Sequence, residues 1–153
     1  MKTTVFLVGA GPGDPGLITV KAEKLLKIAD VIVYDYLSNP IFLNKANNNC
    51  KLINAGKRLG FKAMSQAQIN KKLVSLAKQK YKNIVRLKGG DPLLFGRGGE
   101  EAEYLKKNKI NFEIVPGITS AIAVPAYAGI PISHRDSTSS FCIVTGHEDP
   151  EKN

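Results

Sequence analysis

The chain has 153 residues, which is enough for one ordinary domain and short of two. Its hydrophobic content of 43% and charged content of 23% are typical of a globular protein and argue against disorder. No apolar run approaches the length of a membrane span, and the first residues lack a signal-peptide pattern. We therefore expect a cytoplasmic protein with no membrane partner.

The formal net charge of +9 restricts the class of ligand. Eighteen of the 22 basic residues are lysines, which are spread along the chain as on ordinary solvated surfaces. Three arginines, Arg58, Arg97 and Arg135, stand beside glycines or in loops instead. Because arginine binds carboxylates and phosphates bidentately, a polyanionic ligand fits this pattern. Charge alone would also allow nucleic acid, but the chain has no aromatic-interleaved basic strand or recognition-helix pattern, so we expect no nucleic-acid partner.

The sequence offers no pattern of metal ligands. Cys50 and Cys142 stand alone, far from any CxxC spacing, and we expect two ordinary buried thiols. His134 and His147 lie in predicted loops without other residues at ligand spacing, so hydrogen bonding is the simpler role for them.

Strands and helices are predicted to alternate along the first three quarters of the chain. Five apolar or β-rich runs predict strands: Thr4–Val8, Val31–Tyr34, Lys51–Asn54, Ile84–Leu87 and Phe112–Val115. Helices are expected at Ile18–Ala29, briefly from Pro40 to Leu43, behind a capping box at Ser65–Gln68, and at Gly99–Lys107. This alternation indicates an α/β fold with a mostly parallel five-stranded sheet and crossover helices.

The pattern changes after the fifth predicted strand. Pro116 and Gly117 break it, a small-residue helix is predicted at Thr119–Ala128, and a sixth strand at Phe141–Thr145. One strand cannot build a sheet of its own, so it either joins the first sheet or begins a second domain. We expect residues 1–116 to form an N-terminal α/β domain and residues 117–153 to be the start of a C-terminal one.

The stretch from Val85 to Glu101 is the strongest candidate for a ligand-binding turn. Gly89 and Gly90 follow a predicted buried strand and allow the backbone to approach a ligand without a Cβ in the way. Asp91 comes just past the carboxyl end of that strand, where open α/β sheets bind ligands. The alternative is a tight strand-to-helix turn with incidental charges. Five glycines, three basic residues and three acids in this short span favour the ligand.

An earlier loop has the outward form of a dinucleotide-binding motif. It follows the first predicted strand and carries three glycines in GxGxxG spacing, Gly11, Gly13 and Gly16. Pro12 and Pro15, however, remove two backbone N–H groups that a pyrophosphate would need, and Asp14 adds a negative charge there. We interpret the loop as a rigid wall beside the site.

Seven ordered blocks of the sequence resemble the tetrapyrrole methylase family. They are Val8–Pro15, Val33–Asp35, Gly56–Arg58, Arg86–Glu101, Val115–Ala121, Ala128–Pro131 with His134–Arg135, and Thr145–His147. The blocks cover nearly the whole chain and are far more specific together than any single glycine motif. Members of this family have two α/β domains with S-adenosyl-L-methionine bound between them, and they work as homodimers.

The resemblance implies an activity and a set of site residues. The activity is the methylation of uroporphyrinogen III to precorrin-2, on the way to sirohaem or cobalamin, with S-adenosyl-L-homocysteine as the other product and no metal. The implied cofactor contacts are Pro12, Gly89, Gly90, Asp91, Leu94, Thr119 and Ser120. Asp35 matches the position of the proton acceptor, and Lys57 that of the proton donor.

The chemistry of the residues agrees with this assignment but leaves alternatives open. Glycine amides and an acid at a strand end suit the ribose hydroxyls and the amino-acid end of the cofactor. Asp35 could instead be a helix N-cap or a turn acid, and Lys57 a surface lysine. The three loop arginines are candidates for binding the carboxylates of the substrate. Their alternative is pairing with the nearby acids Glu100, Glu101 and Asp136.

The second domain of the family continues well beyond the last matching block. We therefore expect this chain to be incomplete, to bind S-adenosyl-L-methionine weakly or not at all, and to be inactive alone. Two other functions remain open: methylation of a later precorrin, and a non-catalytic module for dimerisation or ligand binding.

Overall fold

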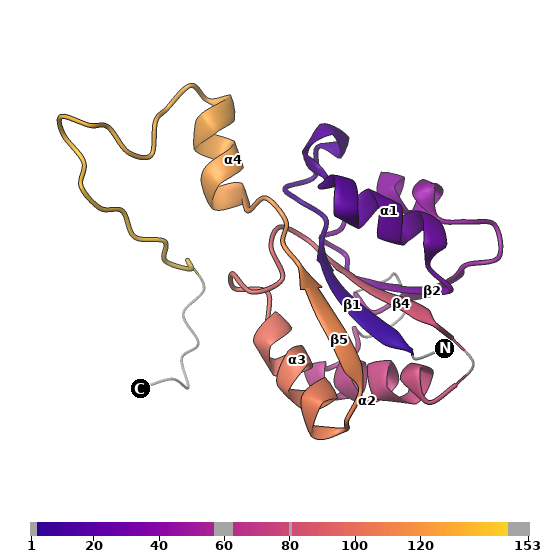
Figure 1. The fold of residues 1–153 in the computed structure, drawn as a ribbon. Helices are drawn as coiled ribbons and strands as arrows, with labels where there is room; N and C mark the ends of the chain where they lie inside the picture. Colours follow the sequence, from indigo (N-terminus) through magenta and orange to yellow (C-terminus); the bar gives the residue numbers. More distant parts are fainter. Residues whose placement is uncertain (1–2, 57–62, 80, 147–153) are drawn as a thin grey trace. The chain divides into compact units, whose positions relative to one another are not determined.

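The structure is a computed structural model, which describes residues 3–56, 63–79 and 81–146. The chain divides into two compact units, Met1–Thr119 and Ser120–Asn153. The first unit contains the sheet and is built from three layers, with the sheet between two layers of helices (Figure 1).

The sheet of the first unit has five parallel strands in the order β3-β2-β4-β1-β5. Their bounds are β1 Thr4–Gly9, β2 Val31–Tyr34, β3 Lys51–Asn54, β4 Asn83–Lys88 and β5 Asn111–Val115. All five predicted strands are confirmed, with ends that differ from the prediction by at most one residue. Because β4 lies between β2 and β1, strands far apart in the chain end side by side at the same edge of the sheet.

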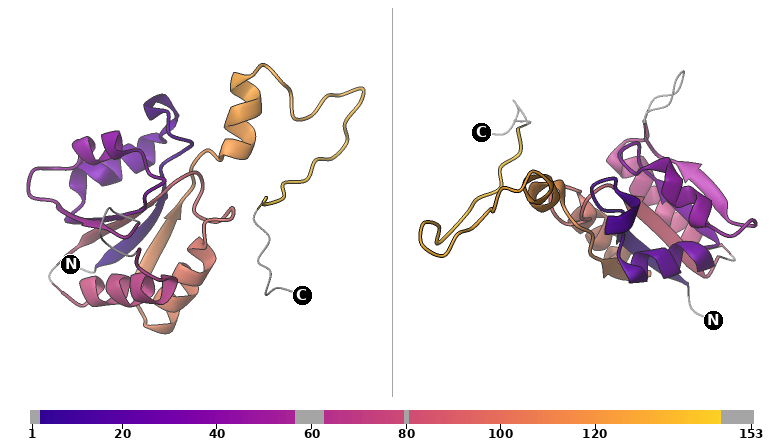
Figure 2. Two further views of the ribbon diagram at one scale, coloured as in Figure 1. Left: turned by 180° about the vertical axis from the view of Figure 1, so that it is seen from behind. Right: turned by 90° about the horizontal axis from the view of Figure 1, so that it is seen from above.

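Helices cover both faces of the sheet (Figure 2). The α1 helix (Val20–Ile28) and the 3-10 helix η2 (Pro40–Lys45) pack on one face, and α2 (Gln66–Ala77) and α3 (Gly98–Lys107) pack on the other. A further 3-10 turn, η1 (Pro15–Leu17), precedes α1. The short helix expected after Pro40 is therefore a 3-10 helix.

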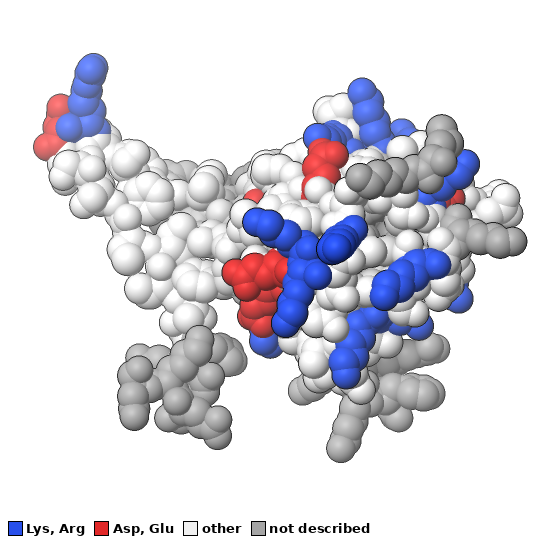
Figure 3. Space-filling view, turned by 60° about the horizontal axis from the view of Figure 1, so that its bottom comes forward, with Lys and Arg blue, Asp and Glu red and all other residues white. Residues whose placement is uncertain are grey.

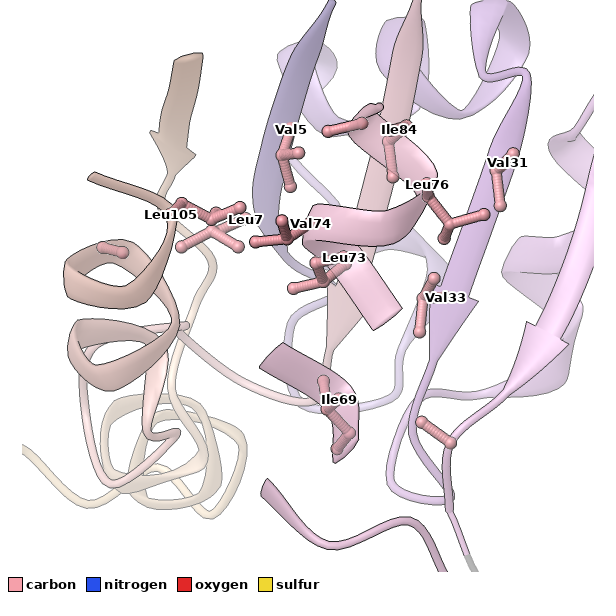
Figure 4. Close-up of a cluster of buried hydrophobic side chains, with 13 residues drawn as sticks. Val5, Leu7, Val31, Val33, Ile69, Leu73, Val74, Leu76, Ile84 and Leu105 are labelled. Atoms are coloured by element: carbon pink, nitrogen blue, oxygen red, sulfur yellow. The ribbon is translucent and has the colours of Figure 1, made fainter. Parts of the chain in front are cut away.

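The core has two clusters, one on each face of the sheet. The side chains of β4 alternate between them, since Ile84 contributes to the α2 side while Val85 and Leu87 contribute to the α1 side. On the α2 side, Leu73 and Leu76 of α2 pack against the apolar side chains of β1 and β2 (Figure 4). Burial of both faces explains why β1 and β2 read as continuous apolar runs rather than alternating ones.

The predicted capping box at the start of α2 is present. The Ser65 hydroxyl accepts a hydrogen bond from the Gln68 amide at 3.3 Å, and the Gln68 side chain accepts one from the Ser65 amide at 2.8 Å. Thr19 caps α1 through the Ala22 amide at 3.1 Å. These side chains satisfy amide groups that the first helical turn leaves without partners.

The second unit contains one helix, α4 (Ser120–Tyr127), in its described part. The strand predicted at Phe141–Thr145 is wrong, because these residues have no strand conformation. A strand needs a paired neighbour to satisfy its backbone groups, and no described segment pairs with this one. The expectation of two buried thiols is also wrong, since Cys142 is exposed and Cys50 is half-buried.

Charged side chains of both signs lie on the surface of the described residues. Lysine and arginine side chains are spread over the face shown in Figure 3, and acidic side chains lie among them. Within the described residues, no helix has the length and apolar character needed to cross a bilayer. In the same part of the chain, no three His, Cys, Asp or Glu side chains gather where they could hold a metal ion.

Candidate active site

The candidate site lies at the carboxyl edge of the sheet, where β1 and β4 end side by side. The chain after β1 continues to α1 on one face of the sheet, whereas the chain after β4 continues to α3 on the opposite face. Open α/β sheets bind ligands at such a switch in the direction of the connections. The topology therefore supports a ligand site at Gly89–Asp91, the turn favoured by the sequence.

Three loops approach each other there through glycines. The loops after β1 and β4 are joined by paired hydrogen bonds between Gly11 and Gly90, at 2.8 and 3.2 Å. A Cβ on Gly9 would lie 2.6 Å from Gly117 Cα and 2.6 Å from the Gly90 carbonyl oxygen. No side chain fits between backbones at this separation, so the loops can meet only because these positions are glycine.

The Asp91 carboxylate holds two of these loops in place. Its Oδ1 accepts hydrogen bonds from the amides of Leu93 at 2.8 Å and Leu94 at 3.3 Å, and its Oδ2 accepts one from the Gly117 amide at 3.1 Å. A carboxylate has about four acceptor positions, so one remains for a ligand hydroxyl. The structure thus gives Asp91 a structural task in addition to the cofactor contact that the sequence predicts.

Asp91→Asn should lower the free energy of unfolding by about 1–3 kcal/mol, because an amide NH₂ group would face a backbone N–H that now has an acceptor. Urea unfolding of the 153-residue chain measures this. Glu113→Gln is the control, since Glu113 forms an exposed ion pair with Lys21, and such a pair contributes at most about 1 kcal/mol. Equal effects of the two substitutions would contradict the structural role of Asp91.

The loops after β2 and β3 pack against the same edge. A Cβ on Gly89 would lie 2.9 Å from Leu37 Cβ and 3.0 Å from its carbonyl oxygen, and a Cβ on Gly56 would lie 2.9 Å from Tyr36 Cβ. Asp35, which directly follows β2, is thereby held next to the end of β4. Lys57 and Arg58, the other predicted residues of this region, lie outside the described residues.

A buried cluster of charged side chains lies under this edge, on the α2 and α3 face. The Arg86 guanidinium of β4 contacts the Asp35 carboxylate at 2.6 Å and Glu101 Oε1 of α3 at 3.0 Å. Lys88 Nζ also contacts Glu101 Oε1 at 3.0 Å. The side chains of Arg86, Lys88 and Glu101 are at most 4% exposed, whereas that of Asp35 is 26% exposed. Two acids and two bases balance in charge, as buried ions must.

Sequence reasoning missed Arg86, Lys88 and Glu101 as members of the site. The sequence pattern places Arg86 within an apolar strand, and it suggests Glu101 only as a partner for loop arginines. A signal was present, because Arg86 and Lys88 occupy alternate positions of an apolar strand and so point to the same covered face. Charges in such a place require buried partners.

Burial lowers the pKa of Lys88, and the neighbouring Arg86 guanidinium lowers it further against the opposing effect of Glu101. Between this lowered pKa and the usual value of 10.5, the unfolded chain binds a proton that the native chain does not. The stability that Lys88 contributes therefore rises with pH across this window and is lost as the pH falls through the native pKa. Lys88→Met should remove this slope from the unfolding free energy measured in alkaline buffers. An identical slope in the variant would contradict the assignment.

The other predicted site residues lie in several places. Pro12 is half-buried in the loop after β1, and the Leu94 amide is bound by Asp91. Arg97, at the start of α3, is 59% exposed and forms a bidentate pair with Glu100 at 2.7 and 2.8 Å. Thr119 ends the first unit, whereas Ser120 and the exposed Arg135 belong to the second.

Known proteins resemble the chain over almost its whole length. Residues 4–153 match the family model of the tetrapyrrole (corrin/porphyrin) methylases. The S-adenosyl-L-methionine-dependent uroporphyrinogen III methyltransferase of Methanosarcina barkeri is 59% identical over 148 residues, which cover 97% of this chain and 58% of that protein. The chain thus spans 57–62% of the length of three curated uroporphyrinogen III methyltransferases that it matches.

Solved structures show the same fold. The uroporphyrin-III C-methyl transferase of Thermus thermophilus, crystallised with S-adenyl homocysteine, is 41% identical with a TM-score of 0.74, over 90% of this chain and 56% of that one. A cobalt precorrin-4 methyltransferase is 32% identical with a TM-score of 0.75, over 87% of this chain and 53% of that one. The ordered sequence blocks, the parallel sheet and these matches agree: the chain belongs to the tetrapyrrole methylase family.

Proposed function

We propose that the chain provides the N-terminal part of an S-adenosyl-L-methionine-dependent C-methyltransferase that converts uroporphyrinogen III to precorrin-2, in the synthesis of sirohaem or cobalamin. The observation that carries this proposal is the 59% identity to the Methanosarcina barkeri uroporphyrinogen III methyltransferase, which extends over 97% of the chain. The buried charge cluster next to Asp35 supports it from the structure.

The proposed seat of S-adenosyl-L-methionine is the turn after β4, formed by Gly89, Gly90, Asp91 and Leu94 with Pro12 beside it. Gly90 has a φ of +63°, and a Cβ built on it would meet only Thr119 Cα, at 3.9 Å. Its backbone is therefore open to a ligand on that side, which fits a nucleoside. Thr119 and Ser120 are assigned to the cofactor from the family resemblance. When bound, the cofactor supplies a methyl group on a sulfonium, which needs alignment with the nucleophile more than activation.

In this proposal, Asp35 accepts a proton and Lys57 donates one. Transfer of the methyl group to a fully substituted pyrrole carbon leaves the macrocycle with one extra positive charge, so one proton must leave from another position. Any proton supplied elsewhere must be matched by a second one that is lost. Asp35 suits the first step because its carboxylate is partly exposed at a strand end and fixed by Arg86 at 2.6 Å. Lys57 is assigned as the donor from the family resemblance.

The many carboxylates of the tetrapyrrole are proposed to bind Arg58, Arg97 and Arg135. Arg97 is the best supported of these, because its guanidinium is exposed and already forms a bidentate pair with a carboxylate, that of Glu100. A substrate carboxylate could take the place of Glu100 with the same geometry.

The proposal also includes the organisation of the protein. Residues 1–116 are assigned to the N-terminal domain and residues 117–153 to the start of the C-terminal one, which is supported by the boundary between compact units after Thr119. The family resemblance further implies a homodimer in the cytoplasm. Sedimentation equilibrium can test the homodimer.

The deciding experiment joins residues 1–153 to the part of the Methanosarcina barkeri relative that lies beyond the matched region. This joined protein is given uroporphyrinogen III and S-adenosyl-L-methionine labelled in its methyl group, and the tetrapyrroles are analysed by mass spectrometry. The 153-residue chain and a joined Asp35→Asn variant serve as controls. Labelled precorrin-2 from the joined protein alone is expected. No label in any tetrapyrrole would overturn the proposal.

A later precorrin is the second candidate substrate, because the cobalt precorrin-4 methyltransferase has a similar fold at 32% identity. The same assay separates the two when precorrin substrates are offered beside uroporphyrinogen III. Label that enters only the later precorrin would replace the first proposal with this one.

A further inference from the structure

Glu101 occupies an unusual position for an acid. It lies in the first turn of α3 and is 0% exposed, yet its Oε1 accepts hydrogen bonds from three side chains of two other elements. The donors are Arg86 Nε at 3.0 Å and Lys88 Nζ at 3.0 Å, both on β4, and Gln66 Nε2 of α2 at 3.2 Å. Within the described residues, its Oε2 accepts no hydrogen bond. A carboxylate in such a place is costly, which calls for a reason beyond fold stability.

The Arg86 guanidinium connects Glu101 to Asp35. Its Nε faces Glu101 and its terminal NH2 nitrogen faces Asp35 at 2.6 Å. Because the guanidinium is planar and rigid, fixing the Nε end also fixes the direction of the donor that reaches Asp35. The orientation of Asp35 is therefore set from inside the protein, by a residue on a different element.

The charges of the cluster also connect Glu101 with Asp35. Among the four charged members of the cluster, Asp35 alone is partly exposed, so it is the one that can exchange a proton with a ligand. The described charged groups around it are Arg86 and Lys88 on β4 and Glu101 on α3. Without the Glu101 charge, Arg86 and Lys88 would be left with Asp35 as the one acid of the cluster.

We propose that Glu101 is a positioning residue for the acid–base chemistry of Asp35, acting through the Arg86 guanidinium. The inference rests on the proposed function, because it takes Asp35 as the proton acceptor. It adds a residue to the site that does not touch substrate or cofactor and that controls both the direction and the charge of one that does.

Kinetics of the joined protein test the proposal. Glu101→Gln should lower kcat by about 100-fold, as a small displacement of a reacting group does, while KM for S-adenosyl-L-methionine stays within about twofold. The acid limb of the kcat profile should move to lower pH. Glu101→Asp keeps the charge but shortens the reach, so it should lower kcat and leave the acid limb in place.

Leu105→Ala is the matched control, because Leu105 is 1% exposed on the same helix and its truncation destabilises α3 without changing any charge. It should leave the acid limb unchanged. If Glu101→Gln gives the profile of Leu105→Ala, or keeps the rate of the unsubstituted protein, the proposal is wrong.

An activity-independent measurement separates this proposal from the proposed function. In the 153-residue chain, NMR can follow the Arg86 Nε–H and the Asp35 carboxyl carbon. Glu101→Gln should expose the Nε–H to solvent exchange and change the chemical shift of the Asp35 carboxyl carbon. An unchanged Asp35 resonance would overturn the role of Glu101. Absence of methyl transfer by the unsubstituted joined protein would overturn the proposed function, whereas the link between Glu101 and Asp35 is judged by the NMR measurement.

Discussion

Glu101→Leu should lower the free energy of unfolding by about 3–5 kcal/mol, which is the cost of removing one partner from a buried ionic cluster. The leucine leaves Arg86 and Lys88 facing Asp35 alone, with one positive charge in excess beneath α3. Urea unfolding of the 153-residue chain, followed by circular dichroism, measures the loss.

The double variant Lys88→Met/Glu101→Leu tests whether the two side chains stabilise the fold as a pair. It removes one charge of each sign and leaves Arg86 and Asp35 as a neutral pair. Its destabilisation should therefore be smaller than the sum of the two single effects by about 1–3 kcal/mol, as for residues in contact. The control pairs Lys88→Met with Thr19→Ala, since Thr19 caps α1 on the opposite face of the sheet. The losses of unfolding free energy from Lys88→Met and Thr19→Ala should add to within about 0.5 kcal/mol. If the effects of Lys88→Met and Glu101→Leu also added, the two side chains would not interact as the structure places them.

Gly9→Ala should lower the free energy of unfolding by about 3 kcal/mol, at the upper end of the effect of overpacking. Its Cβ would lie 2.6 Å from Gly117 Cα and from the Gly90 oxygen. These backbone atoms are held by hydrogen bonds just past the strand ends, so they cannot move aside as a side chain can. The loops that form the proposed cofactor seat would separate, so cofactor binding by the joined protein should fall as well.

Gly99→Ala is the matched control for this substitution. Gly99 lies in the first turn of α3, and a Cβ there would meet nothing within 4 Å. The variant should be more stable than the unsubstituted chain by roughly 0.5–1 kcal/mol, because alanine favours the helix. Similar losses of unfolding free energy for both alanine variants would show that Gly9, Gly90 and Gly117 do not meet as the structure places them.

The elements of the fold could be predicted because each depends on neighbours in the chain. The apolar run of β2 and the Ser65–Gln68 capping box are local patterns, and they appear in the structure at the expected residues. The strand predicted at Phe141–Thr145 failed for the opposite reason, since a strand forms only when another segment pairs with it.

The candidate site was predictable only in part. Its location followed from glycines and an acid at the end of β4, which is a local pattern in an α/β fold. The approach of Gly9, Gly90 and Gly117 is not local, because it depends on the order of the strands in the sheet. The contact of Glu101 with Arg86 likewise depends on where α3 crosses the sheet, which no spacing in the sequence encodes.

In the proposed function, the turn after β4 receives the nucleoside of the cofactor and the proline-containing loop after β1 supports that turn. A crystal structure of the joined protein with S-adenosyl-L-homocysteine tests this most directly. The nucleoside should lie against the backbone of Gly89 and Gly90, within hydrogen-bonding distance of Asp91. A nucleoside resting on Gly11 and Gly13, away from Asp91, would contradict it.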